Sequence, residues 1–219
     1  MNLNSVYNDM KLWDSLRRDP DVIKKLFREG NSLSFTMSEH LAGDFIHAYP
    51  AVKTNRKAEL KLHFYLIGCN YDTRDAFESK KLKTLNCLVQ NIGFPKEMLT
   101  SYLSYEEAKA LVDDWVKHSE KWIEEQCNSE YGMFSAFSIP STPFSGTDLH
   151  LDAFFSLKPD SAEIAGLKSY AADLVLYDKA DRQLVAYHDT VRPVPPFGQK
   201  KQGTDKEAFY LLKLAGLLK

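Results

Sequence analysis

The sequence predicts an α+β protein with a mainly antiparallel sheet of about seven strands, which come in two blocks and are covered by helices. In two stretches of the chain, apolar residues alternate with polar ones, as in strands with one buried face. Before and between these stretches, apolar residues recur every three or four positions, as on a helix. Strands and helices therefore come in blocks, which disfavours a doubly wound parallel sheet.

We expect a single domain that spans residues 1–219. The chain is 44% hydrophobic and 26% charged, as in an ordinary globular protein with a sizeable core. It contains no internal repeat, no low-complexity tract and no stretch with the composition of a linker.

Two helices are expected at the N-terminus. Apolar residues three or four apart, among them Met10 and Trp13, define one face of the first helix. Asp19 and Pro20 are typical of the N-cap and first position of a second helix, and Gly30 is typical of its end.

The first block of strands follows these helices. Residues 32–38, 44–49 and 59–67 alternate between apolar and polar side chains or are rich in strand-forming residues. Their short connections predict an antiparallel meander.

Two more helices are expected between the strand blocks. The first is predicted from an apolar stripe that ends at Gly93. Its members are Phe77, Leu82, Leu85, Leu88, Val89 and Ile92. Ser104 and Glu107 form a capping box that opens a long helix, with Trp115 and Trp122 on its apolar side. Residues 105–130 hold eight acids against three lysines, so the outer face of this helix is expected to be acidic.

The last third of the chain is predicted to hold the second strand block. Residues 131–139, 148–157, 169–177 and 183–191 read as strands, and a final helix is expected from Asp205. Residues at the apolar phase of these patterns should form one contiguous core. They are Phe35, Phe45, Leu62, Phe64, Leu66, Trp115, Trp122, Leu151, Leu174 and Leu176.

Composition argues against several classes of partner. Thirty acidic side chains nearly balance 28 basic ones, so no overall field attracts nucleic acid. No apolar run approaches the ~18 residues of a membrane span, and the N-terminus does not resemble a secretory signal. Three scattered cysteines do not suggest a disulfide framework. We therefore expect a soluble cytoplasmic protein that binds neither nucleic acid nor membranes.

A metal site is one hypothesis for function. His150 and Asp152 are two residues apart on an expected strand and so face the same side. His188, on a later strand, could supply a second imidazole, and two histidines with one carboxylate are a ligand set for non-haem iron. Polar residues on a solvated strand face explain the same pattern without a metal.

An anion site is a second hypothesis. Gly198 and Gly203 have the spacing of a phosphate-binding loop, but Thr204 stands where that motif requires lysine, which excludes a nucleotide triphosphatase. Arg192, Lys200, Lys201, Gly203 and Thr204 lie close in sequence, before an expected helix, whose free N–H groups could bind a phosphate or carboxylate. We expect the stretch to be mainly a connector, in which Thr204 and Glu207 cap the last helix, with anion binding as the alternative.

No catalytic motif fixes a reaction, so the sequence favours a non-catalytic binding or protein-interaction module. Its partner would be another protein or a small anionic ligand. The alternative is a small enzyme, or a metal- or anion-binding protein, that uses His150, Asp152 and His188 or the Arg192–Thr204 loop. No particular cofactor is indicated.

Overall fold

The computed structural model describes residues 2–41, 43–96, 99–100, 103–141, 149–159, 170–179, 183–184, 192–194 and 209–217. Five α-helices lie in this part of the chain: α1 (Leu3–Leu16), α2 (Pro20–Arg28), α3 (Arg74–Glu78), α4 (Tyr105–Asn128) and α5 (Tyr210–Leu214). The longer strands are β1 (Ser32–Thr36), β2 (Phe45–Thr54), β3 (Leu60–Gly68), β4 (Leu85–Gln90), β6 (Ala136–Pro140), β7 (His150–Pro159) and β8 (Tyr170–Asp178). The shorter ones are β5 (Leu99–Thr100), β9 (Gln183–Leu184) and β10 (Arg192–Val194).

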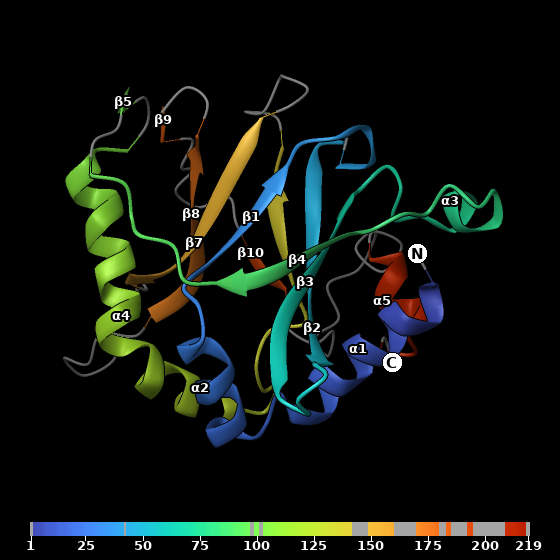
Figure 1. The fold of residues 1–219 in the computed structure, drawn as a ribbon, viewed down its shortest axis with the longest axis horizontal. Helices are drawn as coiled ribbons and strands as arrows, with labels where there is room; N and C mark the ends of the chain where they lie inside the picture. Colours follow the sequence, from blue (N-terminus) through green and yellow to red (C-terminus); the bar gives the residue numbers. More distant parts are fainter. Residues whose placement is uncertain are drawn as a thin grey trace.

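The strands lie in the order β10-β6-β2-β3-β4-β1-β7-β8-β9-β5 (Figure 1). The seven strands of five or more residues pair antiparallel with one another, and only the short pair β5–β9 in the described chain is parallel. The predicted α+β class with an antiparallel sheet of about seven strands is therefore confirmed.

The sheet curls around the main core. β10 contacts β8, although many strands separate the two in the sheet order. Alternate residues of β1, β2, β3, β6, β7 and β8 point into the same hydrophobic cluster, as expected for one buried sheet face. Phe64 of β3 lies at its centre, with ring centroids 6.1 Å from Phe137 and 5.9 Å from Phe155.

α1 and α4 each join this core to a second cluster on the other side of the sheet. In α1, Trp13 belongs to the main core, whereas Met10 packs with Tyr49, Tyr65 and the apolar residues of α5. In α4, Trp115 belongs to the main core, whereas Ala108 and Val112, in the preceding turns of the helix, pack with Phe154 of β7. Figure 1 shows α4 on one flank of the sheet and α1 and α5 on the other.

The predicted helix starts are confirmed by their hydrogen bonds. The Asp19 side chain accepts from the backbone N–H groups of Asp21 and Val22, both at 3.1 Å. Ser104 and Glu107 form the reciprocal capping box that opens α4. None of the helices in the described chain combines the length and the apolar character needed to span a membrane.

The helix predicted between Phe77 and Ile92 is wrong. The structure has the short helix α3 there, followed by strand β4. Cys87 and Val89 of β4 face the main core, whereas Leu88 is 45% exposed. Apolar side chains on both faces of the strand created a three-residue spacing that resembled a helical stripe.

Phe45 is also a correction, because it is 43% exposed rather than in the core. The other nine residues of the predicted core all belong to the main cluster. Phe45 is the first residue of β2, where the strand has not yet entered the covered part of the sheet. Cys87 is buried, and burial raises the pKa of its thiol to about 12.

Candidate functional site

The predicted metal ligands on β7 are already engaged with protein groups. Asp152 is buried, where it accepts from the hydroxyl of Ser34 and forms an ion pair with Lys179, Nζ to Oδ1 2.8 Å. His150 is exposed and its Nδ1 lies 2.9 Å from the hydroxyl of Thr36. His188 lies outside the described residues, and no described group of three or more His, Cys, Asp or Glu side chains could hold a metal ion. The three-residue metal site stays a prediction.

The predicted anion loop lies largely outside the described chain. Arg192 lies in strand β10, where its backbone pairs with that of Ser138 in β6. Lys200, Lys201, Gly203 and Thr204 are not among the described residues, nor is the proposed cap residue Glu207. The described part of the last helix starts at Tyr210, after an N-cap residue, Phe209, without a side-chain cap bond.

A buried polar network that the sequence did not reveal joins β2 to the turn after β3. His47 and Tyr49 are two apart on β2 and face the same side, where Asp72 meets both. Nδ1 of His47 lies 2.7 Å from Oδ2 of Asp72, and the Tyr49 hydroxyl donates to the same oxygen. Because an ionised carboxylate only accepts hydrogen bonds, Nδ1 of His47 carries the proton.

The network also holds the C-terminal helix. The backbone N–H of Leu211 donates to Oδ1 of Asp72 at 2.8 Å. The ring of Phe209 stacks on His47, with centroids 4.2 Å apart. Burial, together with the charge of Asp72, raises the pKa of Tyr49 well above its usual value, so its hydroxyl stays a donor. Asp72 thus ties three elements together.

A carboxylate–imidazole pair is also how many enzymes orient a catalytic histidine. Here His47 is 3% exposed and Asp72 is fully buried, and Phe209 covers the imidazole. Three donors already satisfy the carboxylate. The arrangement therefore braces the fold and fixes α5, and it offers no open face to a substrate.

A second polar cluster lies beside α1 and is partly exposed. The Tyr65 hydroxyl donates to Asp9 at 2.6 Å, and Lys53 Nζ lies 3.1 Å from the side-chain oxygen of Asn86 and 5.0 Å from the Tyr65 ring centroid. His63 is next to this group, and burial, followed by the charge of Lys53, lowers its pKa. These groups bond mainly to one another, so the cluster is a structural junction between α1 and the sheet.

Asp173 of β8 is a buried acid. It sits opposite Ser156 of β7, whose buried hydroxyl has no hydrogen-bond partner in the described chain. Burial raises the pKa of Asp173 to about 7, against the lowering effects of the Leu174 N–H bond and the Lys158 charge. Between pH ~4 and about 7, Asp173 is therefore protonated in the folded protein but ionised in the unfolded chain.

This retained proton predicts that stability falls as pH rises from about 4 to about 7, because the folded state binds one proton more. Asp173→Asn should remove this fall and raise the free energy of unfolding at pH 8 by on the order of 2–4 kcal/mol. Urea unfolding of both proteins at several pH values measures it. Asp75→Asn, at an exposed acid, is the control. A stability difference that is the same at pH 4 and pH 8 would contradict the pKa of Asp173.

The expected acidic face of α4 is in large part neutralised by the protein itself. Glu124 pairs with Lys24 of α2 at 2.6 Å, and Glu120 pairs with Arg28 at 2.8 Å. Further along the helix, Lys109 pairs with an acid one turn later. The Glu124 and Glu120 pairs also fasten α2 to α4. The acidic helix is therefore a weaker candidate for a partner surface than its composition suggested.

A candidate docking surface lies instead on the side of the molecule formed by α1, α3 and α5. Residues 69–84, here called the α3 projection, stand out from the sheet there (Figure 1). Phe77 of this projection is 37% exposed, and its ring centroid lies 6.1 Å from that of Tyr210. We define the α1–α3–α5 surface as these two residues together with four partly exposed apolar residues that pack, like Tyr210, against the buried cluster under α1 and α5. These four residues are Leu3, Tyr7, Leu214 and Leu217.

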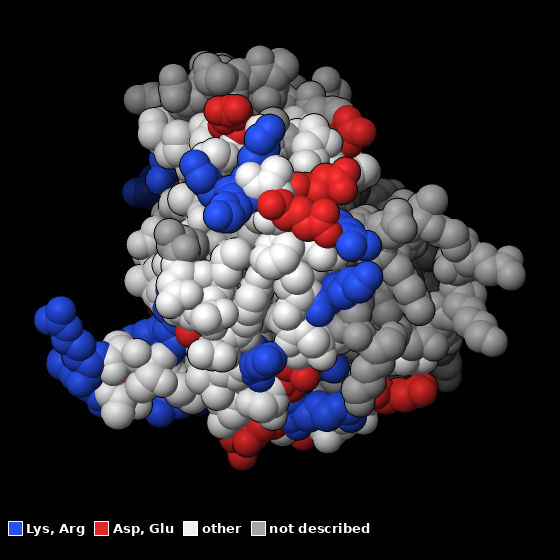
Figure 2. All heavy atoms as spheres, turned by 90° about the vertical axis from the view of Figure 1, so that its right-hand side faces the viewer, with Lys and Arg blue, Asp and Glu red and all other residues white. Residues whose placement is uncertain are grey.

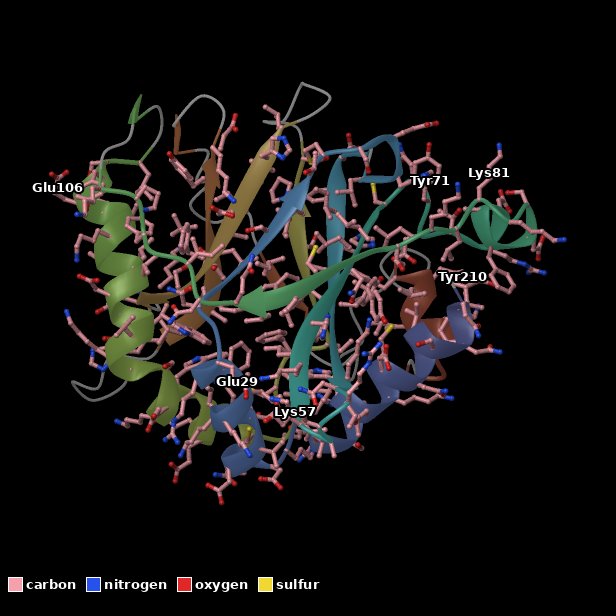
Figure 3. The ribbon with its side chains drawn as sticks, viewed as in Figure 1. Glu29, Lys57, Tyr71, Lys81, Glu106 and Tyr210 are labelled. Carbon is pink, nitrogen blue, oxygen red and sulfur yellow. The ribbon has the colours of Figure 1, made fainter. Side chains whose placement is uncertain are left out.

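This side of the molecule presents an uncharged area with charged side chains above and below it (Figure 2). Tyr210 lies between α3 and α1, and Lys81 extends from the α3 projection away from both (Figure 3). The base of the projection is anchored, because Ala76 and Leu82 are buried. The surface thus has apolar and aromatic side chains on a fixed support.

No known protein family, no curated protein and no solved structure matches this chain. The function is therefore argued from its own geometry.

Proposed function

We propose that the chain is a non-catalytic protein-interaction module that docks its partner on the α1–α3–α5 surface. The observation that carries this proposal is the ring contact between exposed Phe77 and half-buried Tyr210, on the side of the molecule where Figure 2 shows an uncharged area. Contiguous exposed apolar patches rimmed by polar residues mark interaction sites in soluble proteins.

The residue types fit this role. Phenylalanine and tyrosine are enriched in the centres of protein interfaces, where they contribute large contact areas. Lys213 Nζ lies 5.8 Å above the Tyr210 ring, and Arg74 pairs with Glu78 beside Phe77, so charged groups border the aromatic pair. An apolar centre with a polar rim is the usual anatomy of an interface.

The buried polar groups support a binding role over a catalytic one. His47, Tyr49 and Asp72 stand directly behind this surface and hold α5 in place. Through Leu211, the network fixes the helix that carries Tyr210. The buried polar residues on this side of the protein thus hold the aromatic pair in position.

Photo-crosslinking tests the proposal. With a photoreactive benzophenone side chain in place of Phe77, irradiation in a lysate of the source cells should give a discrete covalent adduct with another protein. The same group at Val116, which is 69% exposed on α4, is the matched control. The adduct should form when the photoreactive group is at position 77 and not when it is at position 116. Unlabelled wild-type chain should compete with its formation, whereas unlabelled Tyr210→Ala chain should not. Equal labelling from both positions, or no competition, would contradict the proposal.

A further inference from the structure

The α3 projection ends in a rigid turn that displays three lysines. Lys80 has a positive φ of 57°, and its N–H donates to the carbonyl of Phe77 at 3.0 Å. The N–H groups of Lys81 and Leu82 both donate to the carbonyl of Ala76, at 2.7 and 3.0 Å. Since Leu82 is buried, the backbone of the exposed lysines on either side of it is anchored.

A lysine at position 80 is unexpected on structural grounds. Helix ends that turn through positive φ favour glycine, because a side chain strains this conformation. Non-glycine residues in this conformation are enriched at functional sites. Lys80 is followed by Lys81 and Lys83, so a cationic side chain stands where glycine would suit the backbone better.

These lysines are available to a partner. Within the described chain, Arg74 of the projection is paired with Glu78 at 2.6 Å, whereas Lys80, Lys81 and Lys83 form no ion pair with another described residue. All three are exposed and lie within six residues of Phe77 in the same projection. The projection thus combines an aromatic anchor with three lysines that form no ion pair with a described residue.

We infer that the partner presents an acidic segment, with carboxylates facing Lys80, Lys81 and Lys83 and an apolar side chain against Phe77 and Tyr210. This inference rests on the proposed function of the α1–α3–α5 surface. Opposite charges at an interface rim speed association and select the partner, while the apolar centre supplies most of the affinity.

The first experiment separates the effect of the lysine charge on partner binding from its effect on the stability of the fold. Lys80→Gly removes a cation and relieves backbone strain, so it should raise Tm by about 1–3 °C while lowering the yield of the Phe77 crosslink several-fold. Ala58→Gly is the matched control, because Ala58 also has a positive φ, of 60°, but lies in the hairpin between β2 and β3. It should raise Tm similarly and leave the crosslink unchanged.

The second experiment reads the partner directly. Lys81→Glu with Lys83→Glu should reduce crosslinking about tenfold, as should raising sodium chloride from 50 to 500 mM. Lys57→Glu, at an exposed hairpin lysine, should have no effect. Mass spectrometry of the crosslinked peptide should identify a segment rich in Asp and Glu.

The outcomes separate the two proposals. A Phe77 adduct that is insensitive to salt and to lysine substitution, or whose peptide is neutral or basic, overturns the acidic partner but leaves the docking surface intact. A covalent dimer of this chain also overturns the acidic partner, because it makes the surface a self-association site. Absence of a Phe77-dependent adduct overturns the docking surface itself.

Discussion

Replacing Phe64 with alanine should lower the free energy of unfolding by about 3–5 kcal/mol. The side chain is fully buried at the centre of the curled sheet, where its ring lies near those of Phe137 and Phe155. The strands on both sides of β3 are fixed by antiparallel pairing, so the surrounding residues cannot collapse into the cavity without breaking the sheet. Urea denaturation followed by tryptophan fluorescence measures the loss.

Phe77→Ala provides the contrast for this measurement. Phe77 is the same residue type in an exposed position, so its truncation should change stability by less than about 1 kcal/mol. The two variants together separate loss of a core side chain from loss of a phenyl group as such. A Phe64→Ala protein as stable as Phe77→Ala would place Phe64 at the surface and reverse the register of β3.

The parts of the fold that were predictable from the sequence are those with local signals. Asp19 with Pro20, and Ser104 with Glu107, form helix starts through hydrogen bonds within a few residues, so the pattern alone identifies them. The alternation in residues 59–67 predicts β3 for the same reason, because side chains of a strand alternate between faces whatever lies beyond.

The errors came where a local pattern has two solutions. In β4, Leu85 and Leu88 are three apart, as on a helix, while Cys87 and Val89 are two apart, as on a strand. Only the neighbouring strands β3 and β1, which pair with β4 on either side, decide in favour of the strand. Burial of Phe45 could not be judged locally either, since it depends on how far the covering elements extend along β2.

The buried polar network could not be predicted from the sequence, for a different reason. His47 and Tyr49 share a strand face, which the sequence shows, but Asp72 is 25 residues from His47 and the N–H of Leu211 is 139 residues from Asp72. No spacing rule links such positions, because the curl of the sheet and the docking of α5 bring them together. The docking surface has the same origin, since its residues come from α1, α3 and α5.

Asp72 is the residue whose loss should disturb this side of the protein most. Asp72→Ala should cost about 3–5 kcal/mol of stability, because it leaves His47, the Tyr49 hydroxyl and the Leu211 N–H without their acceptor in a buried site. Asp75→Ala, at an exposed acid three residues later, should change stability by no more than about 0.5 kcal/mol. Thermal and urea unfolding compare the two.

Hydrogen exchange distinguishes a local role from a global one. If Asp72 is the anchor of α5, amides of residues 210–215 should exchange faster in Asp72→Asn, which keeps the size of the side chain but offers one acceptor oxygen to three donors. Amides of β7 and β8, on the opposite side of the sheet order, should keep their protection. Tyr210 would then lose its fixed position beside Phe77, so crosslinking through Phe77 should weaken as well. Unchanged exchange in α5 would show that Phe209 and the apolar contacts hold the helix without Asp72, and that the network does not support the docking surface.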